Sequence, residues 1–211
     1  HVRSRRQRQM CIRDSLMAEI SATAARLVVE EGLEYGPAKR RALKQLKLPA
    51  RTALPDNDQL EAEVREYLAV FCGETQPDEL RALRGLALEW MNRLADFRPY
   101  LSGAVWTGTA TRLSDIYLQL FCDDPKSAEI ELINRDVRYD VASIPGFQGQ
   151  TVDVLSIGVR GEASGVLAGE TVMVHLVIYD LDDLRGALKA DPQGRVPVSY
   201  THLRAHETSL H

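Results

Sequence analysis

The sequence has few of the residues that build metal centres and disulfide frameworks. Of its 211 residues, three are cysteines and five are histidines. Cys72 and Cys122 lie far apart without CxxC spacing, and His175 is the only histidine between residues 2 and 201. A multi-histidine metal centre is therefore excluded. The isolated cysteines are typical of small apolar core residues in a protein kept in a reducing compartment.

Long apolar runs and two common catalytic glycine motifs are also missing. No segment approaches the ~20 apolar residues that span a bilayer, so we expect a cytoplasmic protein with no membrane partner. The absence of G-x-x-x-x-G-K-[ST] excludes a P-loop phosphate cradle. The absence of G-x-S-x-G excludes the nucleophile elbow of serine hydrolases.

The two ends of the chain lack the hydrophobic periodicity seen elsewhere. Residues 1–15 (HVRSRRQRQMCIRDS) and 198–211 (VSYTHLRAHETSLH) resemble translated sequencing-adapter read-through, and we treat both as artefactual tails. Removing their six basic and two acidic residues from totals of 26 and 30 leaves 20 and 28, a formal charge of −8. Such an acidic body argues against nucleic acid as a general partner, because any phosphate backbone would need a local basic patch.

Residues 16–98 have the hydrophobic period of helices. The spacing predicts four helices, over about 17–31, 37–48, 56–72 and 78–97. The second expected helix carries a basic run, formed by Lys39, Arg40, Arg41, Lys44 and Lys47. Such a run is either a solvated helix face or a contact for the tail of a nucleotide or for an RNA backbone.

After Pro99 the period changes to that of strands. The pattern predicts strands at 100–105, 116–121, 137–144, 151–159 and 170–179, with a helix at 126–134. This order predicts an α+β fold, with an N-terminal helical region at 16–98 and a mixed β-sheet domain with flanking helices at 99–197.

The stretch LSGAVWTGTATRLSDIYLQLFCDD, residues 101–124, has features that nucleotide transfer requires. Glycine and a small residue at a strand end let the backbone approach a triphosphate closely. Acids at positions i and i+2 lie on one face of the next strand, where their oxygens can hold Mg²⁺. Gly103-Ala104, Gly108 and Ser114-Asp115 stand at positions that suit this arrangement.

These residues resemble the signature of the DNA polymerase β-like nucleotidyltransferase superfamily, in which Gly-Gly or Gly-Ser is followed by Asp-x-Asp or Asp-x-Glu. The wider sequence looks similar to a divergent, uncharacterised bacterial branch of that superfamily. The resemblance implies a nucleotidyltransferase-like fold that uses Mg²⁺ and an NTP, with an acceptor that it does not identify. It implies that Gly103, Ala104, Gly108 and Ser114 face the triphosphate and that Asp115 is a catalytic, metal-binding carboxylate.

The sequence departs from that signature at the second acid. Tyr117 stands in its place, and a phenol that is neutral near pH 7 is a poor magnesium ligand. The third acid is Asp153 in TVDVLSI or Asp140 in RYDV. We favour Asp153 as the other catalytic and metal-binding carboxylate, because alternating apolar neighbours mark its strand more clearly; the competing interpretation is a polar residue on a solvated strand face.

Two functions are compatible with this sequence. One is a magnesium-dependent nucleotidyltransferase that transfers a nucleoside monophosphate from an NTP to an acceptor. The other is a catalytically inactive nucleotide-binding or protein-interaction module of the same fold. Incomplete motif acids leave the enzymatic activity open.

The remaining acids lie where strands end and helical segments begin, which favours helix capping over metal binding. They are Asp123, Asp124, Asp180, Asp182 and Asp183. His175 alternates with apolar neighbours in a strand pattern. A buried, hydrogen-bonded histidine is therefore expected there rather than a catalytic base.

Overall fold

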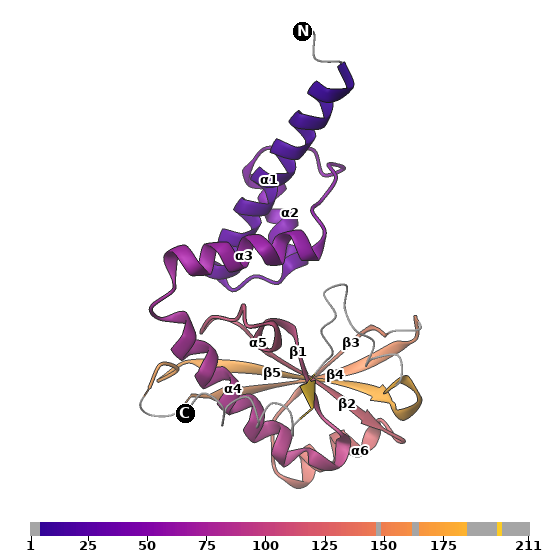
Figure 1. Ribbon diagram of the computed structural model, residues 1–211. Coiled ribbons are helices and arrows are strands. Elements are labelled where there is room, and N and C mark those ends of the chain that lie inside the picture. The colour runs from indigo at the N-terminus through magenta and orange to yellow at the C-terminus, as the bar shows by residue number, and fades with distance from the viewer. Residues whose placement is uncertain (1–4, 147–148, 162–164, 185–197, 200–211) are drawn as a thin grey trace. The chain divides into compact units, whose positions relative to one another are not determined.

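Figure 1 shows the computed structural model of the protein, which describes residues 5–146, 149–161, 165–184 and 198–199. The chain divides into two compact units, His1–Gln76 and Pro77–His211. The first unit is helical and the second is built on a β-sheet. In the described part of the chain, no helix combines the length and apolarity needed to cross a membrane.

The helical unit consists of α1 (Arg5–Glu31), α2 (Tyr35–Gln45) and α3 (Asn57–Phe71). Helix α1 continues through residues 5–15, which we expected to be a tail. It ends before Gly32, whose φ of 66° is a left-handed conformation that glycine adopts without strain. Apolar residues at helical spacing form one buried core: Ile20, Ala24, Ala25, Leu27, Val29, Ala38, Ala42, Leu43, Leu60, Val64 and Leu68.

Helix α3 begins with a capping box. The Asp56 carboxylate accepts a hydrogen bond from the Gln59 backbone N–H at 2.7 Å, and the Gln59 side chain accepts one from the Asp56 N–H at 3.2 Å. Both contacts satisfy backbone donors that a helix start otherwise leaves unpaired.

We expect Asp56→Ala to lower the free energy of unfolding of the helical unit by about 1 kcal/mol, because the N-cap acceptor is lost. Asp56→Asn should retain most of that stability, since asparagine caps equally well. Glu66→Ala is the control, since it removes a charge from the exposed face of the same helix. Urea unfolding followed by circular dichroism checks the result, and equal losses in Asp56→Ala and Glu66→Ala would contradict it.

The second unit contains five helical segments and the six strands that the structure describes. In chain order these elements are α4 (Gln76–Arg93), η1 (Ala95–Phe97), β1 (Tyr100–Ser102), α5 (Gly103–Thr107), β2 (Ile116–Cys122), α6 (Lys126–Asn134), β3 (Asp140–Pro145), β4 (Thr151–Arg160), β5 (Thr171–Asp180), η2 (Leu181–Asp183) and β6 (Val198–Ser199). The expected strand at 100–105 is correct only in its first half. Gly103, with φ of 69°, ends β1 and starts α5.

The strands form one mixed sheet in the order β3-β4-β5-β2-β1-β6. Strands β2 and β5 are parallel, and the other neighbouring strands of the described sheet pair antiparallel. The predicted α+β fold class, a helical region followed by a mixed sheet with flanking helices, is confirmed. Strand β6 pairs with β1 through residues 198 and 199, the first two residues of the segment that we expected to be a C-terminal tail.

One face of the sheet is covered by α4 and α6 (Figure 1). Strand alternation sends Leu118 and Leu176 to this face, where they join Leu83 and Met91 of α4 and Leu132 of α6 in one buried cluster. Helix α4 therefore belongs to the sheet unit. The structure places the boundary at 76/77, whereas the expected boundary at 98/99 would cut through this core.

The opposite face carries a smaller cluster in which aromatic rings predominate. Phe121 packs edge-on against Tyr100, with ring centroids 5.7 Å apart, and stacks on Tyr179 at 5.6 Å. Val152, Val154 and Val177 complete its buried part, and Tyr117 borders it. The candidate site lies on this face.

Candidate functional site

Three polar side chains from three different segments meet beside the start of β2. His175 of β5 lies between Ser156 of β4, whose Oγ is 2.8 Å from His175 Nδ1, and Asp115, whose Oδ2 is 3.2 Å from His175 Nε2. Both ring nitrogens thus have a partner, which fixes the orientation of the imidazole. The His175 side chain is 17% exposed and that of Asp115 is 38% exposed. We call these three residues, with Tyr117, the His175 cluster.

Tyr117 lies against the imidazole in the same cluster. The parallel pairing of β2 with β5 sets Tyr117 directly beside His175, and their rings stack with centroids 4.7 Å apart and planes 27° from parallel. Since the two residues are cross-strand neighbours, both rings project from the same face of the sheet. The position that the resemblance assigns to a second acid is therefore filled by a packed aromatic ring.

The glycine turn at residue 103 packs against that same ring. A Cβ placed on Gly103 would lie 3.4 Å from Cδ2 of Tyr117. With its φ of 69°, this position favours glycine on conformational grounds as well. The close backbone approach expected here is thus made to the phenol ring of Tyr117.

The other predicted triphosphate contacts also have structural tasks. Gly108 ends α5 in a left-handed conformation, and its N–H donates to the Ala104 carbonyl at 2.9 Å. The Ser114 hydroxyl accepts from the Thr111 N–H at 3.0 Å, while the Ser114 N–H donates back to the Thr111 carbonyl at 2.8 Å. These bonds shape the loop that carries the chain from α5 to Asp115. A role against phosphate stays a prediction for all of them.

The structure does not bring Asp153 to Asp115. Ser156 points toward His175, and β4 pairs with β5 in unbroken register, so strand alternation turns Asp153, three residues earlier, to the other face. There its carboxylate accepts a hydrogen bond from the Ser143 hydroxyl at 3.2 Å. The pairing of Asp115 with Asp153 as metal ligands, which we favoured from the sequence, is therefore not the arrangement found.

The alternative acid, Asp140, lies on the face of the His175 cluster. It is the cross-strand neighbour of Ser156, and Ser156 is in turn the neighbour of His175. Strand β3, which carries Asp140, is three strand spacings of about 4.8 Å from β2, next to which Asp115 lies. This distance is too long for the two carboxylates to share a metal ion. Neither Asp153 nor Asp140 therefore provides a second carboxylate beside Asp115.

The residues present do not fit a magnesium pair. Asp115 contacts the imidazole of His175, on which the phenol ring of Tyr117 stacks. An imidazole nitrogen and a neutral phenol are both poor ligands for Mg²⁺, which prefers oxygens such as those of carboxylates. Over the described ranges, no group of three or more histidine, cysteine or acidic side chains is arranged to hold a metal ion.

Two of the acids at the ends of β2 and β5 cap the backbone that follows them. The Asp124 carboxylate accepts from the Lys126 N–H, and the Asp180 carboxylate accepts from the Asp182 N–H, both at 2.9 Å. The capping interpretation is confirmed for Asp124 and Asp180. Asp183 differs, since it is buried and accepts a hydrogen bond from the Gln150 side chain at 3.0 Å.

The pKa of the Cys122 thiol is raised by its burial and by nearby acids. Desolvation, with smaller contributions from Asp124, Asp180 and Asp123, raises the pKa of Cys122. A thiol with a raised pKa holds its proton near neutral pH and is a weak nucleophile. The expectation that Cys122 is an apolar core residue agrees with its burial.

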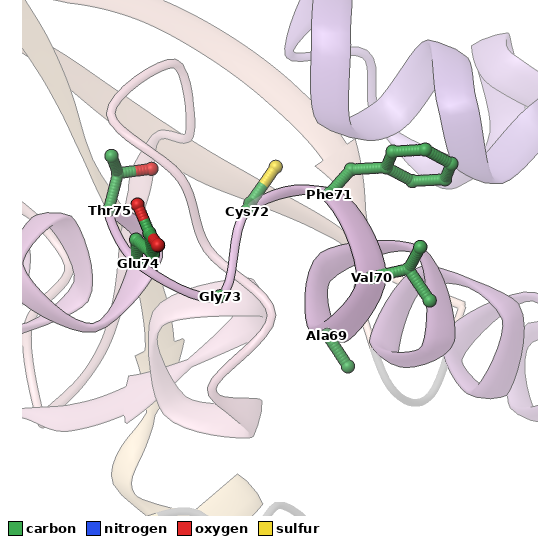
Figure 2. A pocket seen from close by; sticks show the side chains of 7 residues that line it. All are labelled: Ala69, Val70, Phe71, Cys72, Gly73, Glu74 and Thr75. Atoms are coloured by element: carbon green, nitrogen blue, oxygen red, sulfur yellow. The ribbon is translucent and has the colours of Figure 1, made fainter.

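The helical unit has a hollow at the C-terminal end of α3, drawn in Figure 2. Its volume is about 290 Å³, and residues 69–75 line it. Phe71 and Val70 at its rim are 68% and 67% exposed. Glu74 is the charged residue of its lining. None of the predicted site residues lies in the lining, so this hollow is not the predicted site.

Sequence reasoning missed the connection of Asp115 to His175 and Ser156. The strand pattern predicted a buried, hydrogen-bonded histidine. The structure confirms the hydrogen bonds, but the His175 side chain is partly exposed rather than buried. No local signal identified its partners, because residues 115 and 175 meet only through the parallel pairing of β2 and β5.

Comparisons with known proteins give little further information. No family model matches the chain, and no curated protein matches it. A solved structure of Cid1 in complex with the UTP analog UMPNPP matches with a TM-score of 0.32 and 13% identity. The match covers 54% of this chain and 36% of that chain, and we base no inference on a likeness at this level.

Proposed function

We propose that this protein is a catalytically inactive, nucleotidyltransferase-like module that binds a nucleotide at the His175 cluster without a magnesium pair. The observation that carries the proposal is the position of Tyr117, whose ring lies between Gly103 and His175 where the sequence motif assigns a metal-binding acid. Asp153 on the other face supplies no substitute.

The cluster has chemistry that suits the nucleoside end of a nucleotide. A partly exposed phenol and imidazole offer aromatic surface, while Asp115 and Ser156 offer hydrogen-bonding groups beside it. Bases stack on aromatic side chains whatever their sequence. A carboxylate without a bound cation repels phosphate, so we expect the phosphates to point away from Asp115.

The test is calorimetric titration with each of the four NTPs, with and without Mg²⁺. We expect binding in which Mg²⁺ changes the affinity less than twofold, and no transfer of radiolabelled nucleoside monophosphate to protein or RNA. Tyr117→Ala should weaken binding about 5- to 150-fold, since stacking on one aromatic ring contributes about 1–3 kcal/mol per base. Tyr117→Phe is the matched control, because it retains the ring and should bind nearly as well.

Binding that requires Mg²⁺ and disappears in Asp115→Ala would instead support the magnesium-dependent nucleotidyltransferase. An absence of nucleotide binding under both conditions would contradict the nucleotide-binding proposal and leave the protein-interaction alternative.

A further inference from the structure

Helix α2 presents a concave basic surface within the helical unit. An open hollow of about 600 Å³ is lined by Pro37, Arg40, Arg41, Lys44 and Gln45. All five are exposed, whereas Ala38, Ala42 and Leu43 on the other side of the helix are buried in the core. We call Arg40, Arg41 and Lys44 the α2 basic surface.

The cations of the α2 segment are not equally available. Lys39 faces inward, and its ammonium donates to the Asn57 amide oxygen at 2.7 Å. Arg41 forms an ion pair with Glu31 at 2.6 Å. Arg40 and Lys44 form no ion pair with any other residue that the structure describes.

The spacing of these two cations is unfavourable without an external anion. Arg40 and Lys44 are four residues apart, so they are neighbours on the helix surface, separated by about 6 Å along the axis. Like charges in that relation destabilise an isolated helix. They also line the same hollow, in a protein whose body carries a formal charge of −8 once the two terminal segments are set aside.

We propose that the α2 basic surface binds the phosphate backbone of a single-stranded nucleic acid. Neighbouring cations beside a concave surface match a flexible chain of phosphates, and guanidinium groups bind phosphate oxygens in a planar, two-pronged geometry. A duplex is stiff over about 150 base pairs, whereas a single strand can bend to follow a short concave surface. This inference is independent of the His175 cluster, which lies in the other unit.

The experiment is fluorescence anisotropy with a labelled 20-nucleotide single-stranded RNA at several salt concentrations. Arg40→Gln combined with Lys44→Gln should reduce the affinity about tenfold at low salt. The double substitution should also reduce the slope of log K against log salt by about 1.4, since each neutralised phosphate of a single strand contributes about 0.7. Loss of affinity with an unchanged slope would overturn the phosphate assignment.

The matched control is Arg65→Gln combined with Arg81→Gln, which removes two cations that form ion pairs with Glu61 and Asp78. It should leave both affinity and slope nearly unchanged. Equal losses in the two double variants would show a general charge effect and overturn the proposal.

The arginine-rich N-terminal segment could bind RNA by itself, so the experiment includes a second set of variants. All substitutions are repeated in full-length protein in which Arg3, Arg5, Arg6 and Arg8 are glutamine, so that binding through that segment is removed. The proposal requires that the remaining affinity still depends on Arg40 and Lys44, and complete loss of binding in this background overturns it. A polyglutamate peptide that competes as well as RNA would assign the surface to acidic protein segments instead and would equally overturn it.

Discussion

Replacing Met91 by alanine is expected to lower the free energy of unfolding of the sheet unit by about 3 kcal/mol and to leave the helical unit unchanged. Met91 of α4 has no exposed surface and packs with Leu118 and Leu176 of the sheet. Truncating a fully buried methionine removes its contacts and leaves a cavity that rigid neighbours fill only in part.

Hydrogen exchange followed by mass spectrometry checks this prediction unit by unit. Amide protection should fall across β2 and β5 in Met91→Ala and should stay at the wild-type level in α1, α2 and α3. Leu60→Ala is the matched control, because Leu60 is equally buried but belongs to the core of the helical unit. It should produce the opposite pattern of protection.

The outcome decides between two positions of the boundary. If Met91→Ala lowers protection in the three N-terminal helices and not in the sheet, α4 belongs with them, as the change of hydrophobic period at Pro99 led us to expect. The structure favours the boundary at 76/77, because the apolar stripe of α4 contacts sheet residues.

Most elements could be predicted from the sequence, because their signals are local. A 3.6-residue apolar spacing identified α1, α3, α4 and α6 in their main parts, and strand alternation identified β2, β4 and β5. The main local error was at residues 103–105. Val105 continues an apolar run but lies in α5, because the left-handed backbone at Gly103 turns the chain out of the strand.

Domain assignment and site geometry depend on long-range pairing, which the sequence does not encode locally. The apolar stripe of α4 identifies a buried face without indicating what covers it. Likewise, the alternation around Asp153 established a strand but not the direction of its side chain relative to Asp115. That relation follows from the two intervening ladders, β4 with β5 and β5 with β2.

The resemblance and the structure agree on the chain path and disagree on the chemistry. A strand, a glycine turn and a second strand follow one another from Tyr100 to Cys122 as the motif implies, and the structure adds the short helix α5 between them. Within that path, Tyr117 and His175 form a stacked pair in place of a second carboxylate. A single substitution at residue 117 therefore provides a direct test of whether a second carboxylate there would let the site hold a metal ion.

Tyr117→Asp is expected to strengthen Mg²⁺ binding at least tenfold, which corresponds to about 1.4 kcal/mol. Residues 115 and 117 are separated by two positions, so the new carboxylate can lie on the same side of β2 as that of Asp115. Removing the phenol ring also clears the space beside Gly103, whose added Cβ would meet that ring at 3.4 Å. Two carboxylates would then be available for Mg²⁺ where wild type has one.

Electron paramagnetic resonance of Mn²⁺, displaced by increasing Mg²⁺, measures the change in affinity. Tyr117→Asn is the matched control, because it removes the same ring without adding a charge, and it should bind no better than wild type. Asp115→Asn introduced into Tyr117→Asp should abolish the gain, since both carboxylates are required. An affinity that stays at the wild-type value in Tyr117→Asp, or a gain that survives Asp115→Asn, would mean that the two positions do not face a common site. The position of Tyr117 would then not be what makes the site unsuited to a metal pair.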